Sequence, residues 1–174
     1  MPKSSRKQID EDEKKVIRQL QINSKESIDE IAKKCGFSRQ KVWRVIKRLE
    51  KNKTIWGYHA VVDCEKIDSK LYLMLIKKTH EPVSKIVDII ISRKLEEKAK
   101  EIGVAVGCSD YLHGCFDWSI CFTAPSIKEA KKFCEIVNKL YPNHISEIHL
   151  MEKIFPVTSC NINNPDLNKL KEFL

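Results

Sequence analysis

Side chains that can bind a polyanion are concentrated between Ser38 and Arg48. These side chains belong to Arg39, Gln40, Lys41, Trp43, Arg44, Lys47 and Arg48. Arginine and lysine contact phosphate, arginine also reads guanine in the DNA major groove, and glutamine reads adenine. In a helix, where residues advance by about 100° each, Gln40, Arg44 and Lys47 share one side. Apolar residues recur on the opposite side, at Val42, Val45, Ile46 and Leu49. We therefore expect one side to pack in a core and the other to face an acidic partner, with a simple solvated face as the alternative.

The residues before this helix predict how it is positioned. Ser38 is a typical N-cap, whose hydroxyl accepts from the free amides of the first turn and can also donate to a phosphate. Gly36 is typical of the end of a preceding helix, which we expect over residues 28–35. Ser27 would cap that helix, and Glu30 would complete a capping box. Two short helices joined by a tight turn indicate a helix-turn-helix.

Two flanking segments extend the expected domain. A helix is predicted from Ile9 to Gln21, with Asp10 as its N-cap and further acids in its first turn, where the helix dipole favours them. Residues 55–63 (IWGYHAVVD) are rich in β-branched and aromatic types around one glycine. They predict a wing hairpin after Asn52 that continues into a linker strand.

The charge of the chain is unevenly distributed. Residues 1–60 contain 16 Lys and Arg against 8 Asp and Glu, a balance of +8, while residues 61–174 contain 16 of each. The whole formal excess thus lies in the segment with the helix-turn-helix. Binding to a polyanion releases counterions from such a patch, which favours nucleic acid as the partner over a merely solvated face.

The second half of the sequence predicts an α+β domain. Strands are expected over 71–78, 104–112, 116–124 and 145–155, and helices over 83–102 and 127–140. This β-α-β-β-α-β order is typical of the ferredoxin-like fold, in which both helices cover one face of a four-stranded antiparallel sheet. Alternation along the third strand places Phe116, Trp118, Ile120 and Phe122 on one face. The other face carries little charge, so we expect it to join two copies of the chain.

The chain is expected to comprise a basic arm (1–8), a winged helix-turn-helix (9–58), a linker strand (59–70), a ferredoxin-like domain (71–155) and a tail with a short helix from Asp166 (156–174). No apolar run reaches the roughly 20 residues of a membrane helix, and the basic start is not followed by the apolar segment of a signal peptide. We expect a cytoplasmic protein. Its seven cysteines include no C-x-x-C pair and are expected to be free thiols.

These residues together resemble the Lrp/AsnC (feast/famine) transcriptional regulators of bacteria and archaea, and an archaeal member is expected. The resemblance is carried by IDEDEKKVIRQLQ, ESIDEIAKKCGFSRQKVWRVIKRLE, the IWGYHAVVD segment and the later GCFD. It implies a winged helix-turn-helix that binds double-stranded DNA, followed by an effector-sensing domain of the RAM/AsnC type. It also implies homodimers, with octamers of four dimers as a further assembly, and no cofactor.

In the family that the sequence resembles, a small effector, usually an amino acid, binds near a Gly-x-x-Asp turn between dimers. The corresponding residues here are His113, Gly114, Cys115 and Asp117. Gly114 would let the backbone approach the ligand, and the Asp117 carboxylate would bind its ammonium group. The alternative role for Asp117 is that of a turn carboxylate which accepts backbone amides.

Two further functional classes remain open from the sequence. One is an enzyme that resembles the siroheme decarboxylases, which share this architecture, with His80, His113 or His149 acting on a tetrapyrrole acid. The other is a redox- or metal-responsive DNA-binding regulator whose sensor is Cys108 or Cys115, since His113 and these two thiols form the sequence's one cluster of soft ligands. Without a second spaced pair of ligands, no metal is expected.

Overall fold

The computed structural model describes residues 6–173, with side chains from Gln8 onward. Residues 1–5 of the predicted basic arm lie outside the described residues. Contacts divide the chain into two compact units. The first runs up to Val61 and includes Val157–Leu167, and the second comprises Val62–Pro156 and the residues from Asn168 on.

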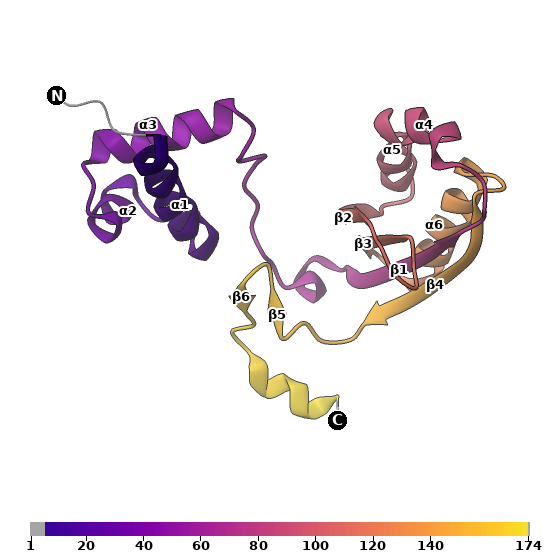
Figure 1. The fold of residues 1–174 in the computed structure, drawn as a ribbon. Coiled ribbons are helices and arrows are strands. Elements are labelled where there is room, and N and C mark those ends of the chain that lie inside the picture. The colour runs from indigo at the N-terminus through magenta and orange to yellow at the C-terminus, as the bar shows by residue number, and fades with distance from the viewer. Residues whose placement is uncertain (1–5, 174) are drawn as a thin grey trace. The chain divides into compact units, whose positions relative to one another are not determined.

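Three helices form the first unit: α1 (Arg6–Ile22), α2 (Ile28–Cys35) and α3 (Arg39–Lys51) (Figure 1). Their apolar stripes meet in one small core, made of Val16, Ile31, Ala32, Val42, Val45 and Leu49. The predicted helix-turn-helix is confirmed. The predicted start of the first helix is wrong, because α1 already includes Arg6 and Asp10 therefore lies inside the helix rather than at its N-cap.

The wing hairpin and the linker strand predicted after α3 are not present as strands. The amide of Ile55 donates to the carbonyl of Leu49 and closes the end of α3, and none of the described residues from Asn52 to Asp63 belongs to a strand. Trp56 is 96% exposed. The linker instead contains a short 3₁₀ helix, Cys64–Ile67. Aromatic and β-branched residues favour a strand only when a neighbouring strand pairs with them, and no described segment of this chain does so here.

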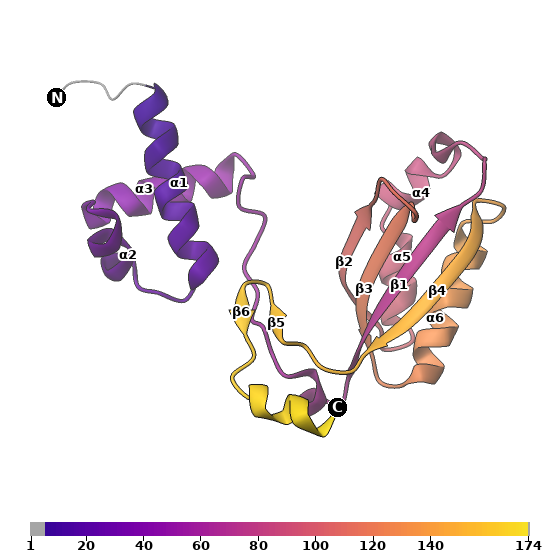
Figure 2. The same cartoon turned by 60° about the horizontal axis from the view of Figure 1, so that its bottom comes forward.

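A four-stranded antiparallel sheet organises the second unit. Its strands are β1 (Lys70–Lys78), β2 (Ala105–Tyr111), β3 (Trp118–Ala124) and β4 (Ile145–Lys153), in the order β2-β3-β1-β4. Helices α4 (Val87–Ile91), α5 (Lys94–Lys100) and α6 (Ile127–Leu140) lie on one face of the sheet (Figure 2). The predicted ferredoxin-like arrangement is thus confirmed.

The core of this unit lies between the sheet and its helices. Tyr72, Met74 and Ile76 of β1 point into it, as do Trp118, Ile120 and Phe122 of β3. Phe133 and Val137 supply the apolar stripe of α6. Strict alternation leaves Leu71, Leu73 and Leu75 on the other face of β1, which we call the open face.

The helix predicted over 83–102 is wrong as one continuous element. The structure breaks it into a 3₁₀ turn at Val83–Lys85, then α4 and α5. Arg93 has a φ of +57° and separates the two α-helices. After the break, Leu95 and Ala99 of α5 are both buried in the core.

The predicted strand placed Phe116 and Trp118 on the same face. In the structure they do not share a face. Strand β3 begins only at Trp118. The Phe116 ring lies 5.2 Å from the His149 ring and 5.8 Å from the ammonium of Lys77, both of which belong to the open face. The chain leaves strand geometry before Trp118, so the period of two does not extend to Phe116.

The tail contains elements that the sequence did not predict. A small hairpin pairs β5 (Thr158–Ser159) with β6 (Ile162–Asn163). The predicted terminal helix is a 3₁₀ helix over Leu167–Glu172. Within the described part of the chain, no helix is both long and apolar enough to cross a bilayer.

Candidate nucleic-acid interface

The turn between α2 and α3 is held by the caps that the sequence predicts. Ser27 and Glu30 form a capping box, since the Glu30 amide donates to Ser27 Oγ at 3.2 Å and the Ser27 amide donates to Glu30 Oε2 at 3.1 Å. The hydrogen bonds from Ser27 hold the pKa of Glu30 below its usual range. Gly36 ends α2 with a φ of +68°, a conformation that glycine adopts without strain. The entry angle of α3 is therefore fixed locally.

Helix α3 has a buried side and an exposed side. Ser38 caps it by accepting from the Lys41 amide at 3.3 Å. Val42, Val45 and Leu49 are buried, and Ile46 is half-buried. Most of the predicted contact residues are exposed, namely Ser38, Arg39, Gln40, Trp43, Arg44, Lys47 and Arg48. Trp43 is 51% exposed and lies on the solvent side rather than in the core.

Two of the predicted contact residues are bound to acids on α1. Lys41 Nζ lies 2.6 Å from Asp12 Oδ2, and Arg48 Nε lies 2.6 Å from Glu13 Oε1. The Asp12 side chain is only 6% exposed and Glu13 is 19% exposed. These ion pairs join α1 to α3, and the acids were predicted only as helix-dipole partners. The ion pairs were not predicted, because each of them forms where two helices cross.

Asp12 remains ionised in this setting. Burial is the largest single influence and raises its pKa, but hydrogen bonds from Lys41 and Gln8 and the attraction of Lys41 and Lys15 outweigh it. The net result is a pKa below the usual range. Lys41 also lies over the Phe37 ring, 3.9 Å from its centroid, which ties the turn to the same ion pair.

The remaining cations of α3 are not bound to α1. Arg44 Nε donates to the Gln40 carbonyl of its own helix at 3.3 Å. Arg39 makes an exposed 3.5 Å contact with Asp29, which is worth little in water. Lys47 pairs with Glu50 at 2.9 Å, and this hydrogen bond holds the pKa of Glu50 below its usual range. Gln40, Arg44 and Lys47 thus present an amide, a guanidinium and an ammonium on one face of α3. These are the kinds of donor that bind base edges and phosphates.

The predicted effector residues are not gathered into one pocket. His113, Gly114 and Cys115 are exposed on the turn between β2 and β3. A Cβ at Gly114 would meet nothing within 4 Å, and Gly114 is not among the residues with positive φ. Nothing among the described residues therefore requires a glycine at that position.

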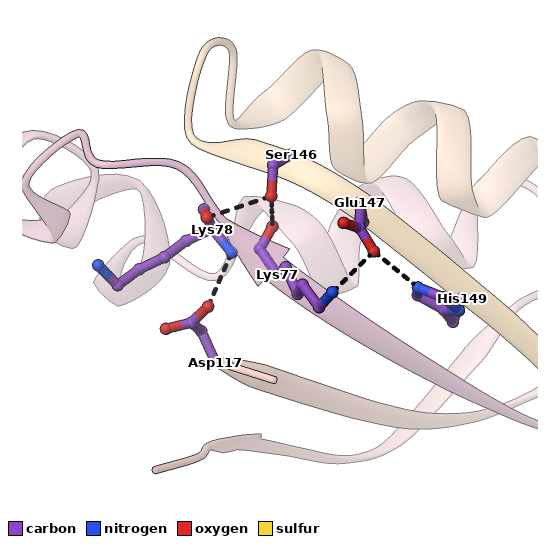
Figure 3. Close-up of polar contacts among 6 residues, drawn as sticks. All are labelled: Lys77, Lys78, Asp117, Ser146, Glu147 and His149. Carbon is purple, nitrogen blue, oxygen red and sulfur yellow. Dashed lines mark hydrogen bonds and ion pairs between the residues drawn. The ribbon is translucent and has the colours of Figure 1, made fainter. Parts of the chain in front are cut away.

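Asp117 is anchored to the sheet. Its Oδ2 accepts from the Lys78 amide at 2.9 Å, as Figure 3 shows, and its own amide donates to the Ile76 carbonyl at 2.9 Å. Its carbonyl accepts from the Leu112 amide at 2.8 Å. The Asp117 carboxylate thus accepts a hydrogen bond from a backbone amide, which is the alternative role that the sequence left open.

A small cavity lies beside Asp117, on the helix side of the sheet. Its volume is about 20 Å³, room for roughly one water molecule. His144 lines it, with Nδ1 2.8 Å from the Pro142 carbonyl and a buried Nε2 that has no partner among the described residues. Trp118 and Tyr141 form apolar walls. This cavity is too small for an amino acid.

A polar cluster marks the open face near the same turn. Glu147 Oε2 accepts from Lys77 at 3.0 Å and lies 3.0 Å from His149 Nε2 (Figure 3). The hydrogen bonds from His149 and Lys77 hold the pKa of Glu147 below its usual range. Phe116 packs edge-on against His149. Among residues 6–173, no group of three or more His, Cys, Asp or Glu side chains is arranged to hold a metal ion.

A helix-turn-helix with an exposed basic face, followed by a ferredoxin-like sheet, defines a two-domain class of nucleic-acid-binding protein. Residues 9–55 match the family model described as winged helix-turn-helix DNA-binding. The match ends at Ile55, where the strand predicted after α3 would begin.

Relatives extend this result over more of the chain. An HTH-type transcriptional regulator of Bacillus subtilis, YugG, is 27% identical over 131 residues, which cover 72% of this chain and 73% of the relative. The leucine-responsive regulatory protein of Haemophilus influenzae is 29% identical over 115 residues, 66% of this chain and 62% of the relative. The chain is thus a homologue of the Lrp/AsnC helix-turn-helix transcriptional regulators.

The two-part fold is shared as well. The structure of a feast or famine regulatory protein from M. tuberculosis, complexed with L-methionine, is similar over 87% of this chain and 95% of that chain. The TM-score is 0.65 at 15% identity, which establishes the fold alone.

Proposed function

We propose that the chain is a sequence-specific DNA-binding transcriptional regulator of the Lrp/AsnC type. It binds a palindromic site as a dimer or a higher oligomer, in the cytoplasm, and an amino acid modulates it. One observation carries the proposal: the exposed side of α3 presents Gln40, Arg44 and Lys47, while Val42, Val45 and Leu49 hold the opposite side in the core.

The residues of α3 have different roles in this proposal. Gln40 and Arg44 enter the major groove, where glutamine can bind adenine and arginine can bind guanine through two hydrogen bonds. Arg39 and Lys47 contact phosphates at the groove edges, and Ser38 donates to a phosphate while it caps the helix. Lys41 and Arg48 primarily orient the helix through Asp12 and Glu13.

Binding to a palindromic DNA site requires a second copy of the chain. One recognition helix covers one half-site, and two copies related by a two-fold axis place two helices in successive major grooves, roughly 34 Å apart. The open face of the sheet, with Leu71, Leu73 and Leu75 at its centre, is the proposed surface for that pairing. Its apolar, half-buried side chains favour a protein partner over solvent.

The proposal also includes binding of a small effector. The structure of the M. tuberculosis relative contains L-methionine, so an amino acid is the proposed class of ligand. Because the cavity beside Asp117 holds only about one water molecule, the ligand would bind on the exposed turn His113–Cys115, with a second copy closing the site. Asp117 would then use its second carboxylate oxygen for the ligand's ammonium group.

No enzymatic activity is part of the proposal. The tetrapyrrole alternative required His80, His113 or His149 to act on a bound acid. All three are exposed, and none lines the cavity beside Asp117. His149 is instead paired with Glu147.

Selection of bound sequences from random duplex DNA, with and without a pool of the common amino acids, tests the proposal. The expected result is an enriched palindrome whose half-sites lie about ten base pairs apart, or a multiple of that spacing. Affinity for the selected site should fall by orders of magnitude between about 50 mM and 200 mM salt. Absence of duplex binding at every salt concentration would refute DNA binding. Unchanged affinity with every amino acid would refute only the effector.

A further inference from the structure

Two cysteines face each other across neighbouring strands of the sheet. In the antiparallel pairing of β2 with β3, Cys108 lies opposite Cys121. Cys121 in turn lies opposite Leu73, so both thiols belong to the open face and not to the core beneath the helices. A turn and parts of two strands separate the two cysteines in the sequence, and the sequence alone therefore named Cys108 or Cys115 as a redox sensor without pairing Cys108 with Cys121.

The spacing of the two residues suits a covalent link. Cα atoms directly opposite each other in an antiparallel pair lie about 4.5–5.5 Å apart, and disulfides span Cα separations of about 4.4–6.8 Å. The Cys108 thiol also interacts with Cys121, and this interaction contributes to the raised pKa of Cys108. A bond between them would require little movement of the backbone.

The two thiols differ in their surroundings. The ammonium of Lys153 donates to Cys121 Sγ at 3.4 Å, so this sulfur lies beside a positive charge. Burial raises the pKa of Cys108 to about 11, and its hydrogen bond to Cys121 acts in the same direction. The contact with Lys153 makes Cys121 the candidate attacking thiol, while Cys108 keeps its proton beside it.

We propose that Cys108 and Cys121 are a reversible thiol–disulfide site that hydrogen peroxide oxidises, with Cys121 as the attacking thiol and Cys108 as the resolving thiol. In the first step the Cys121 thiolate attacks one peroxide oxygen, and the O–O bond breaks. Cys121 becomes a sulfenic acid, and the hydroxide that leaves is protonated to water.

In the second step Cys108 loses its proton and attacks the Cys121 sulfur, which forms the S–S bond. The hydroxide displaced from the sulfenic acid takes up a proton and leaves as the second water. Two thiols and one peroxide thus give one disulfide and two waters, a two-electron oxidation of the protein. A dithiol reductant reverses it by thiol–disulfide exchange.

The location gives this chemistry a structural consequence. Strand β2 is at the edge of the sheet and is paired only with β3. A disulfide between them would fix that edge strand covalently. The bond forms within one chain, so the proposal holds whether or not DNA is the partner of α3. Cys108 is exposed on the edge strand β2, away from the β1 leucines at the centre of the proposed pairing surface, so peroxide can approach from that edge.

Peptide mapping of the full-length protein tests the proposal. The reduced protein is treated with one to several equivalents of hydrogen peroxide, alkylated and digested without reductant. The expected product is one peptide pair joined through Cys108 and Cys121, lighter by two hydrogen atoms and separated again by dithiothreitol. Selective oxidation of the exposed Cys115 or Cys160, with Cys108 and Cys121 still alkylated, would overturn the proposal.

The rate of oxidation tests the role of Lys153. Lys153→Gln should slow formation of the linked peptide about fivefold, the effect expected of one exposed charge pair. Lys128→Gln, an exposed lysine on α6, is the matched control and should leave the rate unchanged. Equal rates for wild type and Lys153→Gln would refute Cys121 as the activated thiol.

Discussion

Replacing Lys41 with alanine tests whether the ion pairs between α1 and α3 orient the recognition helix or bind DNA. The change leaves Asp12, whose side chain is 6% exposed, without the ammonium 2.6 Å away. Loss of one partner of a buried, charged hydrogen bond costs about 1–3 kcal/mol, and loss of the cation–π contact with Phe37 costs about 0.5–1 kcal/mol. We therefore expect the free energy of unfolding of the helix-turn-helix to fall by about 1.5–4 kcal/mol.

Arg44→Ala is the matched control for this experiment. Arg44 is exposed and contacts only a carbonyl of its own helix, so its loss should change stability by less than about 0.5 kcal/mol. The same change should weaken binding to the preferred DNA site by about 1–3 kcal/mol and relax the base preference at one position. Urea denaturation followed by far-UV circular dichroism measures stability, and fluorescence anisotropy of labelled duplex measures affinity.

A double variant separates the ion pair from the individual side chains. Asp12→Ala combined with Lys41→Ala should be more stable than the sum of the single changes predicts, by about 1–3 kcal/mol, because no buried carboxylate is left without a partner. The reasoning would be refuted if Lys41→Ala kept full stability and lost as much DNA affinity as Arg44→Ala. Lys41 would then be a direct contact to DNA.

Three further predictions concern acid stability, the effector turn and the open face. Acidification below about pH 4 should destabilise the wild type more than Asp12→Asn in parallel acid titrations. The pKa of Asp12 lies below its ordinary value of 3.8 in the folded protein, so its stabilisation is present above that value and is lost as the pH falls through the folded pKa. Asp117→Asn should abolish the effect of amino acids on DNA affinity but keep the fold, since an amide oxygen can still accept from the Lys78 amide; a normal response would exclude that carboxylate from effector binding. Leu73→Lys should give monomers in sedimentation experiments, and an intact dimer would place the interface elsewhere.

Local signals in the sequence predicted the parts of the fold that local contacts determine. The caps at Ser27, Gly36 and Ser38 each act on amides or carbonyls within four residues, and the structure contains all of them. The order of strands and helices in the second unit followed from strand-length apolar runs separated by helical periods. Such patterns depend on the chain's own neighbours and are therefore visible without a structure.

The features that were missed depend on residues far apart in the sequence. Asp12 and Glu13 carry the signature of a helix N-terminus, and nothing local shows that α3 crosses them. No glycine or proline marks the break at Arg93, and Leu95 and Ala99, which follow it, pack in the core with residues from distant parts of the chain. Phe116 follows the strand alternation in sequence, but the chain leaves the strand there because Asp117 is tied to β1.

The cations of α3 differ in whether an acid pairs with them. Glu50 is the one acid in α3, and it neutralises Lys47 and accepts from Tyr58 at 3.3 Å near the C-terminal end. Arg44 differs, because it donates to the Gln40 carbonyl of its own helix and pairs with no acid among the described residues. In helix-turn-helix proteins the N-terminal residues of the recognition helix contact the base edges, while later residues approach the backbone. The guanidinium of Arg44 and this docking geometry thus support the proposal that Gln40 and Arg44 read the bases and that Lys47 contacts phosphate.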